Sequence, residues 1–281
     1  VITIPNSATN LGPYAFDGCF NVRQANLDTP AIGSDFSAMI KLGNLILGDH
    51  VLSISNSVFQ NFFSLTNVSF GNSLINIGDN AFYNCSALRS ITMPNSVTNI
   101  GNTAFQFCVG LTNITIGSGV ANIGNYAFSK CNALRSIIIP SNVQTIGVLA
   151  FSGCNNLSLI YFSGDAPQNN PSFFIGDTGT VYYLPGNIGW GTTFGGLPTA
   201  MWYQPNPVIL GNGHGLGVNT NKFGFTVSWA TNISVVAEAC TNLANPDWQP
   251  VQTNTLTDGT AYFGEVLWTN CLSRLYRLRS L

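Results

Sequence analysis

The sequence predicts a repeat solenoid of short parallel strands joined by turns or short helical segments, followed by a small antiparallel all-β domain. Three observations support this fold class. The dipeptide Ala-Phe recurs with a period of 23, as at Ala81, Ala104 and Ala127, the columns aligned with it are apolar, and the period fails near residue 165. A unit this short cannot bury its own apolar face, so neighbouring units must stack to form a continuous core.

The Ala-Phe dipeptide marks each unit. Four copies follow one another at this period, two earlier copies are modified at the first residue, and the first copy lies closer to the second than one full period. The seven copies are Ala15-Phe16, Asp35-Phe36, Val58-Phe59, Ala81-Phe82, Ala104-Phe105, Ala127-Phe128 and Ala150-Phe151. The first unit is therefore shortened.

Each unit also contains a strand signal. The segment after the Ala-Phe dipeptide reads L-x-x-I-x-I, as in Leu88, Ile91 and Met93, and this alternation is typical of a short strand. Pro94 and Pro140 end two of these strands. We expect successive strands to lie about 4.8 Å apart in one parallel sheet, with the Ala-Phe segment as a helical turn or tight coil opposite.

The unit L-x-x-I-x-I-P-x-S-V-x-x-I-G-x-x-A-F-x-x-C-x-x resembles the BspA-like leucine-rich repeat family of bacterial surface proteins. The resemblance covers Val1 to about Asp165, and units two and three depart most, with Met39 and Phe62 in place of Cys and Ser55 in place of Gly. It implies a leucine-rich repeat solenoid, export to the cell surface or medium, and a role in adhesion or protein binding.

The charge distribution excludes nucleic acid as a partner. Only 7% of residues are charged, the formal net charge is -2, and the nine basic residues are dispersed along the sequence apart from Arg274, Arg277 and Arg279. A nucleic-acid-binding protein needs a concentrated basic footprint. The three terminal arginines form either a small anion patch or a solvated strand edge.

The sequence carries no targeting segment of its own. No apolar run approaches the roughly 20 residues that span a bilayer, so we expect no membrane insertion. Because the chain opens without Met and partway through a repeat, we interpret it as a mature chain or a fragment with its export signal upstream.

We divide the chain into residues 1–165 (the leucine-rich repeat solenoid), 166–205 and 206–281. Residues 166–205 are rich in Gly, Pro and aromatic residues. We interpret them as a degenerate repeat and an aromatic cap, with a strand at Val181–Leu184, because a solenoid end exposes core residues unless they are covered. The alternative is a carbohydrate-stacking platform that includes Trp190 and Trp202.

The C-terminal segment, residues 206–281, has a different sequence pattern, with short apolar strands between turns marked by Asn, Gly and Asp-Gly. This pattern predicts a small antiparallel β domain. Its ending is similar to C-terminal modules of large exported proteins of environmental bacteria, a resemblance that implies no particular activity. The strands expected are Phe223–Trp229, Ser234–Ala239, Trp248–Val251 and Leu275–Leu278.

Catalytic chemistry is not expected. The two histidines, His50 and His214, are far apart and lack metal-ligand spacing, and Glu238 and Glu265 are the only glutamates. His214 lies in a Gly-rich stretch that lacks the spacing of a phosphate-binding loop, so we interpret the stretch as a connector. We therefore predict a non-enzymatic protein with no catalytic residue, no metal and no cofactor.

The cysteines fall into two groups. Five of them share the column three residues after Phe, where Met39 and Phe62 also occur, so we interpret them as small buried hydrophobic residues. Cys240 and Cys271 lie outside that column. They either form a disulfide in the β domain or remain two free thiols. The five column members are Cys19, Cys85, Cys108, Cys131 and Cys154.

Asn and Gly recur at fixed places in the unit. Asn76, Asn99 and Asn122, with Asn10 as their equivalent, precede an Ile-Gly or Leu-Gly pair. We expect their stacked amides to bond to successive turn backbones. The repeated glycines are expected to supply turn conformations that are closed to other residues.

A partner would bind on the outer face of the sheet, formed by the residues that flank the central Ile of each strand. This face is uncharged and suits a broad, modest contact with an extracellular protein or glycan. Small residues also simply suit a crowded sheet surface, and a structural spacer or anchoring segment is the alternative function. The candidate residues are Asn67, Ser69, Ser90, Thr92, Asn113, Thr115, Ser136, Ile138 and Tyr161.

Overall fold

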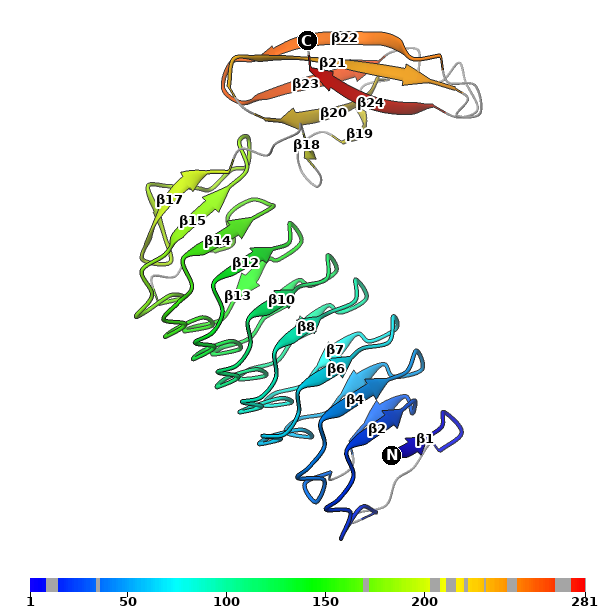
Figure 1. The fold of residues 1–281 in the computed structure, drawn as a ribbon. Helices are drawn as coiled ribbons and strands as arrows, with labels where there is room; N and C mark the ends of the chain where they lie inside the picture. Colours follow the sequence, from blue (N-terminus) through cyan, green and yellow to red (C-terminus); the bar gives the residue numbers. More distant parts are fainter. Residues whose placement is uncertain are drawn as a thin grey trace. The chain divides into compact units, whose positions relative to one another are not determined.

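The computed structural model describes residues 1–8, 15–33, 36–168, 172–202, 208–210, 216–219, 222–229, 231–241, 247–265 and 274–280. The chain divides into two compact units. Unit 1 comprises Val1–Tyr182 and Gly189–Ala200, and unit 2 comprises Tyr183–Ile188 and Met201–Leu281. Unit 1 is a stack of similar turns of chain, here called rungs (Figure 1).

The first face of unit 1 carries the strands predicted from the L-x-x-I-x-I segments. They pair in parallel in chain order, as in Gln24↔Asn44 and Ser90↔Asn113. The expected single sheet is instead three successive ones, β1-β2-β4-β6, β8-β10 and β12-β14-β15-β17-β16. The strands of this face are β1 (Ile2–Ile4), β2 (Gln24–Leu27), β4 (Asn44–Leu47), β6 (Asn67–Ser69), β8 (Ser90–Thr92), β10 (Asn113–Thr115), β12 (Ser136–Ile139), β14 (Leu159–Phe162) and β15 (Thr180–Tyr183).

A second parallel sheet, absent from the sequence prediction, forms another side of unit 1. Its six strands have two residues each, too few for an alternating pattern to be visible in the sequence. Each of the six consists of an Ile and the residue before it. They are β3 (Ala31–Ile32), β5 (Ser53–Ile54), β7 (Asn76–Ile77), β9 (Asn99–Ile100), β11 (Asn122–Ile123) and β13 (Thr145–Ile146).

The Ala-Phe segments form turns on the third side, and the described residues contain no helix. Backbone amides of Phe82 and Phe105 donate to the carbonyls of Ala104 and Ala127 on the next rung, both at 2.8 Å. Left-handed residues lie two positions before and two positions after each Phe of these segments from Phe59 to Phe151, such as Asn80 (φ 54°) beside Phe82. Of the two forms expected for the Ala-Phe segment, a helical turn or a tight coil, the tight coil is therefore the correct one. No helix long and apolar enough to cross a membrane is present in the described part of the chain.

A continuous stack of phenylalanine rings forms the centre of the core. Successive ring centroids are 4.7 to 5.6 Å apart. Aromatic pairs at this spacing add about 0.5–1.5 kcal/mol each beyond the area they bury. The stack runs through Phe16, Phe36, Phe59, Phe82, Phe105, Phe128, Phe151 and Phe174. Because Phe174 extends it, the segment after residue 165 contains one further rung.

The cysteine column lies beside this stack. Cys85, Cys108, Cys131 and Cys154 are buried, which confirms their interpretation as small core residues, whereas Cys19 is half-buried. Each buried thiol donates to a Phe carbonyl of the preceding rung at 3.1–3.3 Å. Burial raises the pKa of Cys108 to about 12, so this thiol stays protonated and unreactive at neutral pH.

The glycines of the Ile-Gly pairs have a different role from the one expected. Gly78, Gly101, Gly124 and Gly147 are not among the residues with positive φ. A Cβ on Gly101 would instead lie 2.6 Å from the amide nitrogen of Asp79 and 2.6 Å from the carbonyl carbon of Gly78. The expectation of special turn conformations is therefore wrong for these four, which are needed because the rungs approach too closely for a side chain.

At the C-terminal end of unit 1, a hairpin of β16 (Thr193–Phe194) and β17 (Leu197–Met201) covers the last rungs. Trp190 and Phe194 pack on Phe162, with ring centroids 4.9 and 5.3 Å away. The strand expected at Val181–Leu184 is β15. The Trp190 ring is engaged in this cluster, and the Trp202 side chain is half-buried, so neither is the fully exposed ring that the carbohydrate-stacking alternative requires.

Asp177 takes the cysteine column position in the added rung, one period after Cys154. Both of its carboxylate oxygens are buried and lack a hydrogen-bond donor. Burial raises the pKa of Asp177 to about 7, and the nearby Cys154 amide and Lys130 ammonium offset only part of this effect.

Unit 2 is an antiparallel β domain, as predicted. One sheet has the order β18-β20-β19, with β23 also paired to β20, and the other has the order β22-β21-β24. Phe225, Val235 and Phe263 lie in its core. The strands are β18 (Val208–Leu210), β19 (Gly217–Asn219), β20 (Lys222–Ser228), β21 (Ile233–Cys240), β22 (Gln249–Leu256), β23 (Thr260–Glu265) and β24 (Leu275–Ser280). Sequence reasoning missed β18, β19 and β23.

The three terminal arginines are ion-paired, with Arg277 and Arg279 on the edge strand β24 and Arg274 directly before it. Arg277 and Arg279 donate to the Glu238 carboxylate at 2.6 and 3.0 Å, and these bonds hold the Glu238 pKa below its usual range. Arg274 donates to Glu265 at 2.8 Å. The strand-edge interpretation is therefore confirmed, and the arginines do not form an anion patch. Cys271 and His214 lie outside the described residues, so the expectations about them remain predictions.

We predict that Gly101→Ala destabilises unit 1 by about 1–3 kcal/mol, the usual cost of overpacking. The matched control is Gly43→Ala, since a Cβ there would meet nothing closer than 3.6 Å. Urea unfolding of both variants measures the difference. Equal stabilities would show that the rungs do not require glycine at this position.

A second prediction concerns pH. Because the folded pKa of Asp177 lies above its ordinary value of 3.8, the native state retains a proton that the unfolded chain releases. Stability from this group is therefore greatest below about pH 4 and falls as the pH rises through 7. Asp177→Asn should remove the fall and stabilise unit 1 at pH 8 by about 1–3 kcal/mol.

Thermal unfolding at pH 5 and pH 8 measures this effect, with the exposed Asp17→Asn as the control for loss of one negative charge. If the stabilities of the wild-type protein and the Asp177→Asn variant depended on pH in the same way, the fall would not be due to the raised pKa of Asp177.

Candidate functional site

The structure places all nine candidate residues on the first face of unit 1. They occupy alternate positions of five neighbouring strands, β6, β8, β10, β12 and β14. Eight are exposed, and the ninth, Tyr161, is half-buried. The alternation arises because Val68, Ile91 and Ile114, the central residues of three of these strands, point into the core.

The character of the face changes along its length. At the N-terminal part, side-chain amides bond across rungs, as where Asn67 donates to Asn44 at 2.9 Å. Serine and threonine occupy the middle. At the C-terminal part, Ile138 is 51% exposed, and the Tyr161 and Tyr182 rings stack with centroids 5.1 Å apart. The face therefore runs from polar to partly apolar without a charged residue among the nine candidates.

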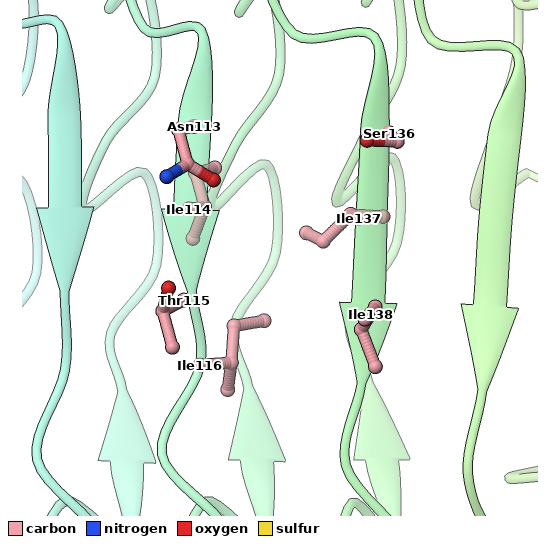
Figure 2. Close-up of a pocket in the computed structure, with 7 residues that line it drawn as sticks. All are labelled: Asn113, Ile114, Thr115, Ile116, Ser136, Ile137 and Ile138. Atoms are coloured by element: carbon pink, nitrogen blue, oxygen red, sulfur yellow. The ribbon is translucent and has the colours of Figure 1, made fainter.

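A shallow depression of about 270 Å³ lies on this face between β10 and β12. It falls at a junction between two of the three sheets, since β10 pairs with β8 and β12 pairs with β14. Figure 2 shows seven side chains that line it, contributed by the two strands and by the residue directly after β10. They are Asn113, Ile114, Thr115, Ile116, Ser136, Ile137 and Ile138.

The depression has the chemistry of a binding surface. Its seven residues supply an amide, two hydroxyls and four isoleucines, and none titrates near neutral pH. They can donate and accept hydrogen bonds and bury apolar groups of a partner. In the described residues, no group of three His, Cys, Asp or Glu side chains is arranged to hold a metal ion.

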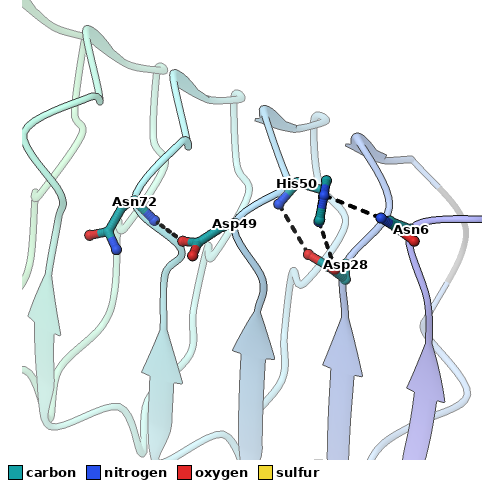
Figure 3. A network of polar contacts seen from close by, with 5 residues as sticks. All are labelled: Asn6, Asp28, Asp49, His50 and Asn72. Atoms are coloured by element: carbon teal, nitrogen blue, oxygen red, sulfur yellow. Dashed lines mark hydrogen bonds and ion pairs between the residues drawn. The ribbon is translucent and has the colours of Figure 1, made fainter.

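His50 belongs to a polar network at the corner after the first-face strands (Figure 3). Its Nδ1 lies 2.8 Å from an Asp28 carboxylate oxygen, and its Nε2 lies 3.2 Å from the Asn6 amide nitrogen. The pKa of Asp28 is lowered, first because the His50 backbone amide donates to it. Since Nε2 faces an amide rather than a hydroxyl or thiol, this His-Asp pair links three rungs and activates no nucleophile.

A polar groove of about 280 Å³ lies on the second sheet. Asp79, Asn102 and Asn125, which line it, belong to a column of Asn and Asp that sequence reasoning missed. Each member of the column follows an Ile-Gly pair or its equivalent. Each side chain accepts from a backbone amide of the next rung, as from Asn102 to Asp79 at 2.7 Å and from Asn125 to Asn102 at 2.9 Å. The column is Asn56, Asp79, Asn102 and Asn125.

The asparagines that were expected to bond to turn backbones behave differently. Asn99 donates to the Asn76 side chain at 2.8 Å, and Thr145 donates to the Asn122 side chain at 2.7 Å. The expectation is wrong about the acceptor, because these residues lie on paired strands whose side chains face one another. The next Asn and Asp column satisfies the turn amides instead. Asn10 lies outside the described residues.

Comparison with known protein families gives a match over most of unit 1. Residues 1–79 and 52–178 match the BspA type leucine rich repeat region, in six copies. No curated protein matches the chain.

Solved bacterial leucine-rich repeat proteins are similar to this chain. A T. pallidum leucine rich repeat protein is 30% identical, with a TM-score of 0.47 over 56% of this chain and 72% of that one. One from Bacteroides ovatus is 24% identical, with a TM-score of 0.49 over 65% and 59%. A leucine rich cell surface protein from Faecalibacterium prausnitzii is 21% identical, with a TM-score of 0.49 over 65% and 62%. The chain thus spans less than two thirds of the latter two proteins.

Proposed function

Because the chain belongs to the BspA-type leucine-rich repeat family, we propose that it is an exported, non-enzymatic adhesion module that binds an extracellular protein through its first face. Secretion or attachment to a cell surface is part of this proposal, and the cell-surface description of the Faecalibacterium prausnitzii relative supports it.

The depression between β10 and β12 carries the proposal. It combines exposed hydrogen-bonding groups with an apolar floor at the middle of the first face, and Ile138 extends its apolar surface outward. Short side chains such as Ser136 and Thr115 lose little rotamer freedom when a partner covers them. A broad contact with many weak polar bonds is the expected mode of binding.

The alternative is a structural spacer within a larger exported protein. The regular hydrogen-bonded rungs of unit 1 also suit that role, and a spacer needs no complementary surface. A glycan partner would need exposed ring faces, whereas Trp190 packs against Phe162 and Phe194, so no observation favours this second kind of ligand.

The test is the double variant Thr92→Arg with Thr115→Arg. The two arginines would cover neighbouring strands beside the depression and would block a flat partner. We predict loss of saturable binding to an immobilised panel of extracellular matrix proteins, with thermal stability changed by less than about 1 kcal/mol because both sites are exposed.

The matched control is Thr98→Arg with Gln144→Arg, which adds the same charge at exposed positions beside the second sheet. Binding lost in both double variants would indicate a charge effect. Full binding by the Thr92→Arg, Thr115→Arg variant would move the site off the first face, and no binding by the folded wild-type chain would favour the spacer.

A further inference from the structure

The basic residues of unit 1 are scattered in the sequence but meet on one edge of the solenoid. Residues 1–202 contain five lysines and arginines, and all five lie in the turns between the phenylalanine stack and the first-face strands. Three arginines directly precede β2, β8 and β12. The basic edge consists of Arg23, Lys41, Arg89, Lys130 and Arg135, all of them exposed.

These cations are open to a partner. Among the described residues, none of the five forms an ion pair within 4.0 Å. Lys41 donates to the neutral Asn21 side chain at 2.8 Å, and the Arg89 guanidinium lies alongside Gly110 of the next rung, 3.5 Å from where a Cβ would stand. The side chains therefore lie along the edge without a carboxylate within 4.0 Å among the described residues, and the Lys130 charge is near enough to Asp177 to lower the pKa of that carboxyl.

The same turns expose the large apolar side chains of the first rungs. Phe20, Ile40 and Phe63 occupy equivalent positions, one residue after Cys19, Met39 and Phe62, and are 54%, 58% and 57% exposed. Val109 holds the equivalent position two rungs further on, at 40% exposure. Contiguous exposed apolar side chains next to cations are the usual composition of a binding surface.

We propose that this edge binds an extended acidic polypeptide segment in which carboxylates alternate with aromatic or aliphatic side chains. Carboxylates would pair with the arginines, for which a planar, two-point contact is geometrically suited. Apolar side chains of the segment would cover Phe20, Ile40 and Phe63. The site is distinct from the first face, and its existence does not depend on the function proposed for that face.

The apolar positions distinguish this partner from other anions. An acidic polysaccharide would satisfy the arginines but would offer no aliphatic group to Ile40. An anionic lipid surface is broad, whereas the edge is a single line of turns, flanked on the first face by uncharged polar residues such as Asn67 and Ser90 that gain nothing from a membrane. A polypeptide matches both the charge and the apolar character along one line.

The experiment uses the intact chain and a random copolymer of glutamate and tyrosine as the probe, with binding measured by fluorescence anisotropy at 50 and 300 mM salt. We expect binding that weakens with salt and exceeds that of polyglutamate. Arg89→Glu with Arg135→Glu should reduce copolymer binding at least about tenfold. Ile40→Ser with Phe63→Ser should reduce it to the level of polyglutamate.

Thr98→Glu with Ser118→Glu is the control, because it lowers the net charge by the same amount as Arg89→Gln with Arg135→Gln, but away from the basic edge, and should retain binding. Arg89→Gln with Arg135→Gln serves if the charge reversal impairs folding. Equal binding by all variants would overturn the proposal. So would binding of polygalacturonate or phosphatidylglycerol vesicles as tight as that of the copolymer, since either would identify a partner without the apolar contribution.

Discussion

The close approach of successive rungs is the constraint on which the rest of unit 1 depends. Each repeating turn of chain buries its apolar side only against its neighbours, so the phenylalanine rings must stack at 4.7 to 5.6 Å. The same approach leaves no room for a Cβ at Gly101. It also brings equivalent polar side chains within hydrogen-bonding reach, as in the Asn99–Asn76 pair.

Because every rung has the same geometry, the different sides of unit 1 have different roles. Polar columns such as Asp79 and Asn102 are occupied in satisfying the backbone of the next rung, so they stabilise the stack rather than recognise a partner. By contrast, outward residues in the middle of the first face, such as Thr92, Thr115 and Ser136, are exposed, as are the cations of the basic edge. Nearer the ends of the face, Asn67 donates to Asn44 and Tyr161 stacks on Tyr182. Unit 1 contains seven aspartates as well as five cations, and what distinguishes the cations is that all five lie along one edge.

The features that could be predicted from the sequence are those that recur at a strict interval. The Phe, Cys and Leu columns and the first-face strands were visible because each recurs at a fixed interval. The second sheet was not visible, since a strand of two residues such as Asn76–Ile77 is too short to show an alternation, even though the pair recurs at the same interval. The glycine role was misassigned because sequence alone does not separate a positive φ from a close backbone approach. The basic edge and the Arg277–Glu238 pair join residues of irregular spacing or distant position, which only the folded chain brings together. The candidate face followed from alternation, but the depression within it, at a junction between sheets, did not.

The unfolding of two deletion variants tests most directly whether the fixed interval between rungs holds the fold of unit 1 together. Removing Thr92–Ile114, one full period, joins Ile91 to Thr115 and keeps every column and the strand alternation in place. Removing Thr92–Asn113, one residue fewer, leaves Ile91 next to Ile114, so the strand places a core side chain on the outer face. We expect urea to unfold the first variant cooperatively at nearly the wild-type midpoint and the second at a much lower one. Equal midpoints would contradict the claim that the fixed interval between rungs holds this fold together.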